Sequence, residues 1–262
     1  MIFGGVDAGS RAIKVALWDA DAGRVVATGL ADQGIAQAQL ARELFESVRA
    51  GAGLNGATLG PVVATGYARG SINFAASRIT EITCHAAGVH QLLADVRTVV
   101  EIGGQDSKLL RLDRSGAVRD FAMNDRCAAG TGRFLEAVAT RLSVPVDHLG
   151  ELARASRSPA AISSMCVVFA ETEIIGLLAG GASPADIVAG VQAAVAARVA
   201  AMAGTDLAQP VALTGGVALV AGMREAIAAA LRVPVGVCPC PQMTGAIGAA
   251  ILASRLAQPA AN

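Results

Sequence analysis

The chain has 262 residues and a mass of 26.2 kDa, which is room for one large domain or two modest ones. Its 21 basic residues balance 21 acidic ones, which excludes a nucleic-acid-binding protein that works through bulk positive charge. The longest apolar stretch, residues 187–202, is interrupted by Gln192 and Arg198, and no cationic segment precedes an apolar run at the N-terminus. We therefore expect a cytoplasmic protein without a signal peptide or a membrane span, in which the five cysteines stay reduced.

The first predicted element is a strand, a glycine turn and a second strand over residues 2–19. The same pattern returns 94 residues later, over residues 99–113. Lys14 and Lys108 are the only lysines of the chain, and they occupy the same place in the two copies. The repeat predicts an internal duplication that requires a compact ammonium group at this place. The matched pairs are Asp7 with Glu101, Gly9 with Gly103, Lys14 with Lys108 and Asp19 with Asp113.

Helical patterns and buried strands follow each hairpin. We expect helices over residues 37–49, 133–142 and 223–232, a helix that begins at Ser183–Pro184, and strands over 62–66 and 211–216. Strands that alternate with helices, in two copies, predict an α/β chain of two similar lobes. We place a first lobe at residues 1–94 and a second lobe at residues 95–262, whose last helix can pack back on the first lobe.

The glycine turns of the hairpins suit phosphate binding, because backbone N–H groups can approach an anion where no Cβ intervenes. Carboxylates beside such turns can hold Mg²⁺, Lys14 can neutralise a transferred phosphoryl group, and Gln105 can orient a water molecule. We predict Asp7, Glu101, Gln105 and Asp106 as catalytic residues, with Asp7 and Asp106 as Mg²⁺ ligands. The predicted ATP-binding residues are Gly9, Ser10, Arg11, Ala12, Lys14, Gly103, Gly104, Lys108, Gly215, Gly216 and Gln242, with Gly215–Gly216 at the nucleoside.

The order of these motifs is itself informative. Two phosphate hairpins followed by a glycine-rich adenosine turn resemble the actin, Hsp70 and sugar-kinase superfamily, known as ASKHA proteins. The resemblance implies a two-lobed α/β fold with duplicated ribonuclease-H-like subdomains. Neither a Walker loop nor a Rossmann fingerprint follows a predicted strand.

Two cysteines open predicted helical stretches. Cys127 precedes the helix near residue 133, and Cys166 precedes an apolar segment that starts at Val167. Helix N-termini favour an anionic thiolate, but most free cysteines are simply small buried hydrophobes. Two cysteines are also too few for a four-iron cluster, which takes four, so a second chain would have to supply the other pair. From these residues alone the packing interpretation is the more common one.

Longer motifs identify a family. Nearly end to end, the chain resembles the BadF/BadG/BcrA/BcrD-type ATPases, which include 2-hydroxyacyl-CoA dehydratase activators and the ATP-binding subunits of class I benzoyl-CoA reductases. The matching segments are residues 124–136, 103–108, 166–171 and 214–218, and Pro241–Gln242 with Gly245–Ala246.

The resemblance implies an ATPase coupled to electron transfer. It implies a [4Fe-4S] cluster shared by two chains through Cys127 and Cys166 of each, ferredoxin as the electron donor, and catalytic iron–sulfur reductase or dehydratase subunits as the acceptor. The second chain is either identical or a paralogous ATPase subunit. No nucleic acid and no membrane are implied as partners.

Within the family we favour the D-type subunit of benzoyl-CoA reductase, which acts in the dearomatisation of benzoyl-CoA. Activators carry Ser-Thr-Thr-Ser-Lys where this chain has residues 10–14, and the stretches at 170–178 and 186–192 look closer to the reductase subunit. The alternative is a homodimeric activator of a 2-hydroxyacyl-CoA dehydratase. More distant alternatives are a small-molecule kinase of the ASKHA fold and an actin-like structural or sensory protein, neither of which needs a cluster.

The remaining cysteines carry less chemistry. Cys84 lies on a helical pattern and is expected to pack in the core, and its neighbour His85 has no second histidine at ligand spacing. Cys238 and Cys240 lie two residues apart among prolines with no other thiol pair nearby, which favours a structural role.

Overall fold

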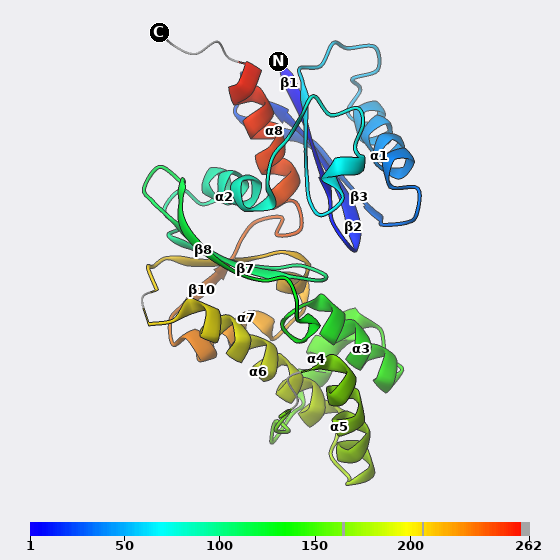
Figure 1. Cartoon of the computed structure of the whole chain (residues 1–262), viewed down its shortest axis with the longest axis vertical. Helices are drawn as coiled ribbons and strands as arrows, with labels where there is room; N and C mark the ends of the chain where they lie inside the picture. Colours follow the sequence, from blue (N-terminus) through cyan, green and yellow to red (C-terminus); the bar gives the residue numbers. More distant parts are fainter. Residues whose placement is uncertain (164–165, 206, 258–262) are drawn as a thin grey trace. The chain divides into compact units, whose positions relative to one another are not determined.

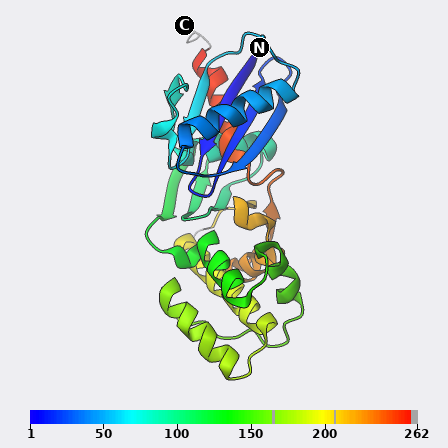
Figure 2. The ribbon, with the colours of Figure 1, turned by 90° about the vertical axis from the view of Figure 1, so that its right-hand side faces the viewer.

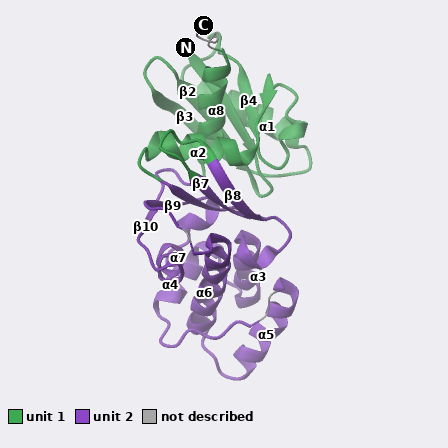
Figure 3. Ribbon diagram, turned by 60° about the vertical axis from the view of Figure 1, so that its left-hand side comes forward, with its two compact units in different colours: residues 1–96, 112–118, 242–262 green, residues 97–111, 119–241 purple. Residues whose placement is uncertain are grey.

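The computed structural model describes residues 1–163, 166–205 and 207–257. They form two compact units (Figure 3). The first unit comprises residues 1–96, 112–118 and the segment from Gln242 onward, and the second comprises residues 97–111 and 119–241. The chain therefore returns at its end to the unit in which it began.

The first unit is built on a five-stranded sheet in the order β3-β2-β1-β4-β5 (Figure 1). β1 pairs antiparallel with β2 and parallel with β4, so the sheet is mixed. The strands are β1 (Ile2–Ala8), β2 (Ala12–Asp19), β3 (Arg24–Asp32), β4 (Val62–Thr65) and β5 (Ser77–Arg78). The expected strand–turn–strand element over residues 2–19 is confirmed as β1 and β2.

Helices cover both faces of this sheet. α1 (Gln37–Gly51) packs Phe45 and Val48 against Val15 and Leu17 on one face. α8 (Thr244–Ala257) packs on the other face, where Ile247 and Ile251 meet Trp18. α2 (Glu81–Leu92) lies beside α8, and a short 3₁₀ turn, η1 (Arg69–Ser71), follows β4. Figure 2 shows α1 in front of these strands.

The second unit repeats the same sheet. Its order, β8-β7-β6-β9-β10, matches the first sheet strand for strand. β6 pairs antiparallel with β7 and parallel with β9, as β1 does with β2 and β4. The strands are β6 (Thr98–Ile102), β7 (Ser107–Leu112), β8 (Val118–Asn124), β9 (Val211–Thr214) and β10 (Val235–Val237). The predicted duplication is confirmed.

The second unit carries more helices than the first. They are α3 (Gly132–Leu142), α4 (Leu149–Arg154), α5 (Val167–Ala179), α6 (Pro184–Ala203) and α7 (Met223–Leu231), with 3₁₀ turns η2 (Ala128–Gly130), η3 (Val146–His148) and η4 (Gly216–Leu219). α6 is long and apolar enough to cross a membrane by length and composition. Its Ile187, Val191 and Val195 are fully buried among residues of this unit, which is the behaviour of a core helix.

Candidate functional site

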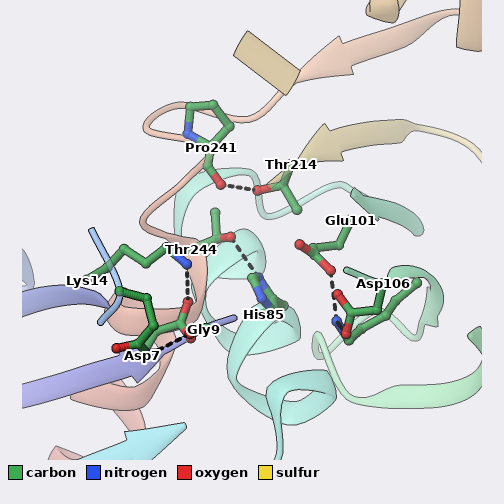
Figure 4. Close-up of polar contacts among 11 residues, drawn as sticks. Asp7, Gly9, Lys14, His85, Glu101, Asp106, Thr214, Pro241 and Thr244 are labelled. Atoms are coloured by element: carbon green, nitrogen blue, oxygen red, sulfur yellow. Dashed lines mark hydrogen bonds and ion pairs between the residues drawn. The ribbon is translucent and has the colours of Figure 1, made fainter. Parts of the chain in front are cut away.

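The first hairpin holds a carboxylate opposite a lysine. Asp7 at the end of β1 pairs in register with Lys14 on β2, so the two side chains leave the same face of the sheet. Lys14 Nζ lies 3.3 Å from Asp7 Oδ2 (Figure 4), and Asp7 is 4 % exposed. The Gly9 N–H donates to the Ala12 carbonyl at 3.1 Å, which closes the turn.

The tip of this turn contains the predicted ATP-binding residues that depart from the activator pattern. Arg11 is exposed, and its guanidinium pairs with Asp32 on β3 at 3.1 Å. Ala12 is buried at the start of β2, and Ser10 is half-buried at the turn. The salt bridge therefore joins the turn to β3.

The second hairpin repeats the pairing with one extra carboxylate. Glu101 on β6 is in register with Lys108 on β7. Lys108 Nζ donates to Glu101 Oε2 at 3.0 Å and to Asp106 Oδ2 at 2.6 Å. The Lys108 side chain is 2 % exposed. The Gly103 N–H donates to the Asp106 carbonyl, and Gln105 is exposed at the tip, where a phosphate or water can reach it.

The predicted adenosine turn follows β9. Gly215 has a φ of +89°, and a Cβ there would collide with the Ile102 carbonyl, so only glycine fits this turn. The Gly215 N–H and the Thr214 hydroxyl both donate to the Pro241 carbonyl, at 2.9 and 2.7 Å. Gly216 is exposed, as a nucleoside contact requires. Gln242 is half-buried and belongs to the first unit.

A matching turn in the first unit was missed by the sequence analysis. β4 ends at Thr65, which is in register with Asp7, just as Thr214 at the end of β9 is in register with Glu101. Gly66 follows with a φ of +92°, and a Cβ there would lie 2.5 Å from Asp7 Oδ1. The signal was present in the sequence, because the same Thr-Gly dipeptide follows both buried strands.

The two predicted cluster cysteines lie at the starts of helical elements in the second unit. Cys127 is half-buried and precedes the 3₁₀ turn η2, so it does not cap α3, which begins only at Gly132. Its N–H donates to Asn124 Oδ1 at 3.1 Å, and Asn124 Nδ2 donates to its carbonyl at 2.8 Å. Cys166 is exposed and is the N-cap residue of α5.

The other thiols differ from this pair. Burial raises the pKa of Cys84 to about 12 and that of Cys238 to about 12. Both are therefore protonated at neutral pH and are poor metal ligands without rearrangement. Cys240, two residues beyond Cys238, is exposed.

The second hairpin is joined by hydrogen bonds to the segment that carries Cys127. The Gly132 N–H donates to the Gly103 carbonyl at 2.9 Å, and the Arg133 N–H donates to the Gly104 carbonyl at 2.9 Å. The Thr131 hydroxyl donates to the Ala128 carbonyl at 2.7 Å and stiffens the intervening turn. Two main-chain hydrogen bonds thus connect the start of α3 to the Gly103–Gly104 turn.

Cys127 and Cys166 offer the thiolate chemistry that an iron–sulfur cluster uses. Within residues 1–163, 166–205 and 207–257, no group of three or more His, Cys, Asp or Glu residues can hold a metal ion. Cys127 and Cys166 supply two thiols, which is half of a four-thiolate set. Beside Cys166, Val168 and Phe169 are 70 % and 69 % exposed, an apolar surface of the kind that protein contacts cover.

A family model for BadF/BadG/BcrA/BcrD ATPases matches residues 5–253. The chain belongs to the BadF/BadG/BcrA/BcrD ATPase family. It is 42 % identical to the activator of lactoyl-CoA dehydratase from Anaerotignum propionicum, over 97 % of this chain and 98 % of that protein. The resemblance stated from the motifs is therefore confirmed.

Solved structures of family members superpose closely. Component A of the (R)-2-hydroxyglutaryl-CoA dehydratase from Acidaminococcus fermentans matches with a TM-score of 0.92 and 37 % identity, over 98 % of this chain and all of that chain. The activator of the 2-hydroxyisocaproyl-CoA dehydratase from Clostridium difficile, with bound ADPNP, gives 0.89 and 36 % identity over the whole of both chains. A ROK-family glucokinase from Streptomyces griseus, at 16 % identity and a TM-score of 0.59 over 97 % of this chain and all of that one, shares the fold alone. The predicted two-lobed ASKHA fold is confirmed.

The preference within this ATPase family changes. The D-type subunit of benzoyl-CoA reductase from Thauera aromatica is 30 % identical over 86 % of this chain and 82 % of that protein. The dehydratase activators are more similar and cover more of both chains. The comparisons thus favour the alternative, an activator, over the reductase subunit that the sequence analysis preferred. The departure from the activator pattern at residues 10–14 had favoured the reductase subunit. In the structure Arg11 of this segment pairs with Asp32 on β3.

Proposed function

We propose that this protein is the ATP-hydrolysing activator of a 2-hydroxyacyl-CoA dehydratase and works as a homodimer. It would receive electrons from ferredoxin and deliver them singly, at low potential, to the catalytic dehydratase subunits. The observation that carries the proposal is the combination of two carboxylate–lysine hairpins with two helix-start cysteines in one family member. Similarity to activators along the whole chain supports it.

ATP and Mg²⁺ would be held by the glycine turns and carboxylates. Asp7 and Asp106 would bind the ion, directly or through water, because hard cations prefer oxygen ligands. Lys14, with one carboxylate partner at 3.3 Å, would neutralise charge on the phosphoryl group. Gln105, exposed at its turn, would orient the attacking water. The ADPNP bound to the Clostridium difficile activator supports nucleotide binding by this fold.

Cys127 and Cys166 of the two chains would hold one [4Fe-4S] cluster, which supplies one-electron transfer when bound. The half-buried Cys127 is fixed by both hydrogen bonds to Asn124. The exposed Cys166 stands where a second chain can approach. Hydrogen bonds between the Gly103–Gly104 turn and the start of α3 would let the nucleotide state act on the Cys127 segment.

The proposal is tested by native mass spectrometry of the chain, expressed alone and purified without oxygen. We expect a homodimer heavier by four irons and four sulfides, with ATPase activity that depends on Mg²⁺. Cys166→Ser removes a ligand, so we expect it to abolish iron binding. Cys240→Ser, a matched change of an exposed cysteine in the same unit, should leave the iron content unchanged.

Other outcomes select the alternatives. An iron-free monomer that gains the cluster only when it is coexpressed with a paralogous ATPase subunit would support the benzoyl-CoA reductase interpretation. The absence of iron in both preparations, with intact ATP hydrolysis, would contradict the role given to the cysteines and favour a kinase of the same fold.

A further inference from the structure

A buried histidine lies beside the first carboxylate and has no role in the chemistry described so far. His85 on α2 is 6 % exposed. Its Nδ1 is 2.9 Å from the hydroxyl of Thr244, the first residue of α8 (Figure 4). Thr244 is itself completely buried. The bond therefore ties two helices together next to the end of β1.

Gly245 brings the histidine and the carboxylate close to each other. A Cβ on Gly245 would lie 2.9 Å from Asp7 Oδ2 and 3.2 Å from His85 Nε2. The carboxylate and the Nε2 edge of the ring thus converge on the same side of the Gly245 α-carbon. Only a residue without a side chain leaves this space open to them.

Close backbone packing fixes this arrangement. A Cβ on Gly88 would collide with the Thr244 carbonyl, and one on Gly248 would collide with the Cys84 carbonyl. α2 and α8 therefore touch through their backbones on both sides of His85. A Cβ on Gly5 would likewise collide with the Ala246 carbonyl, so α8 lies directly on β1. The main chains that carry His85 and Asp7 are therefore held close together.

The surroundings of the ring select its tautomer. Nδ1 is next to the Thr244 hydroxyl, and the Cε1–Nε2 edge of the ring is on the side of the Asp7 carboxylate, so Nε2 is the ring nitrogen nearer to it. A lone pair on Nε2 would point towards negative charge, whereas an N–H there is attracted to it. Nδ1 then accepts the proton of the hydroxyl.

We propose that His85 is a positioning residue for Asp7: its Nδ1 accepts a hydrogen bond from Thr244, and its Nε2–H faces the Asp7 carboxylate and holds it towards Lys14. The inference rests on the proposed function, since its effect on turnover requires that Asp7 acts in ATP hydrolysis. Lys14 and His85 would then fix the carboxylate from two sides, and the ion or phosphate would meet it already oriented.

The first test does not involve turnover. Long-range ¹H–¹⁵N correlation spectra of the ¹⁵N-histidine-labelled protein at pH 8 report which ring nitrogen carries the proton, with His85→Gln used for assignment. We expect the proton on Nε2 and none on Nδ1. A proton on Nδ1 would overturn the proposal, because that ring would turn a lone pair to the carboxylate.

The second test is kinetic. His85→Phe keeps a ring but no nitrogen, and we expect it to lower kcat for ATP by about 10-fold or more, with KM within about twofold. His85→Gln restores an N–H near the position of Nε2 and should recover part of kcat. His90→Phe, the matched change on the same helix, should leave kcat unchanged.

The results separate the two proposals. Unfolding midpoints of all variants distinguish a loss of fold from a loss of positioning. The role of His85 would be contradicted, without affecting the proposed function, if His85→Phe and His90→Phe had equal kcat values. It would also be contradicted if His85→Phe and His85→Gln lost kcat equally. A wild-type chain that hydrolyses no ATP would contradict the proposed function. The protonated ring nitrogen of His85 would still show whether its Nε2–H faces Asp7.

Discussion

The two hairpins are copies of one structural element, yet their lysines are in different electrostatic environments. Lys14 Nζ lies 3.3 Å from one carboxylate oxygen, Asp7 Oδ2, and the Lys14 side chain is 17 % exposed. Lys108 contacts two carboxylates, at 3.0 and 2.6 Å, and is 2 % exposed. A cation matched by two anions has little charge left to offer a phosphate, whereas Lys14 retains more. We infer that duplication supplied the same residue twice and that Lys108 now serves mainly to stabilise its unit.

The largest expected effect is on stability, from Lys108→Met. Removing the ammonium leaves the buried Glu101 and the nearby Asp106 without their cation, which typically costs about 3–5 kcal/mol. Lys14→Met leaves one buried carboxylate, Asp7, without its cation rather than two, so we expect a smaller loss of stability together with the loss of ATP turnover. Denaturant unfolding and ATPase assays on both variants measure the difference.

A double variant sharpens this test. Glu101→Gln added to Lys108→Met removes one uncompensated charge, so we expect it to regain part of the lost stability. Equal destabilisation by Lys14→Met and Lys108→Met would show that the two lysines are equivalent and would contradict the comparison.

The two Thr-Gly turns provide the next test. Gly66→Ala and Gly215→Ala each place a side chain at positive φ, which costs about 1–2 kcal/mol, with a collision in addition. We expect Gly215→Ala to weaken ATP binding at least about 10-fold, since it alters the adenosine turn. Gly66→Ala presses on Asp7 and should lower kcat, with little change in the Kd for ATP.

Isothermal titration with a non-hydrolysable ATP analogue, alongside steady-state kinetics, separates the two effects. If Gly66→Ala weakened nucleotide binding and Gly215→Ala did not, the adenosine turn would belong to the first unit, and the assignment would have to be reversed.

The smallest expected effect is a loss of stability at the start of α6 at low pH. Hydrogen bonds from the Ser158 N–H, the Ser156 and Ser183 hydroxyls and the Arg157 N–H hold the pKa of Asp186 well below its usual 3.8. A carboxyl with a lowered folded-state pKa stabilises the fold above its ordinary pKa and loses this contribution as the pH falls through the folded value. The first turn of α6 should therefore loosen progressively as the pH falls below the ordinary pKa of an aspartate.

Both helices are capped by neutral hydroxyls, Ser183 in α6 and Thr80 in α2, and what distinguishes α6 is the Asp186 carboxylate with a lowered pKa in its first turn. Hydrogen exchange at pH 2 and pH 7, corrected for intrinsic rates, should show lost protection at the start of α6 and not at the start of α2. Asp186→Asn should remove the difference between the two pH values. Equal loss in both helices would show that acid acts on the whole fold.

The two-lobed architecture could be predicted from the sequence because equivalent residues of the two copies stand at a constant offset. The offset of 94 residues that matches Asp7 with Glu101 and Lys14 with Lys108 became the same cross-strand register in both sheets. A period-2 strand pattern and a glycine turn involve residues that are close in sequence, so they can be recognised without the structure. The long motif around Cys127, together with the other matching segments, also identified the family.

Contacts between distant residues were not readable. The sequence showed Asp106 beside Lys108 but not that both carboxylates would close on one ammonium, since this depends on burial in the folded unit. The predicted helix over residues 133–142 is α3, but the sequence did not show that a 3₁₀ turn separates it from Cys127 or that its first N–H groups donate to the Gly103–Gly104 turn.

The sequence by itself determined the duplicated strand–turn–strand element, the two carboxylate–lysine pairs and the family, because these follow from the spacing of residues along the chain. The tertiary structure alone decided which lysine is neutralised, that Thr65–Gly66 repeats the turn at Thr214–Gly215, and that His85 lies beside Asp7. The last of these results depends on α8, a helix from the end of the chain, packing on the first strand. No spacing rule links residues that are 159 positions apart, as His85 and Thr244 are.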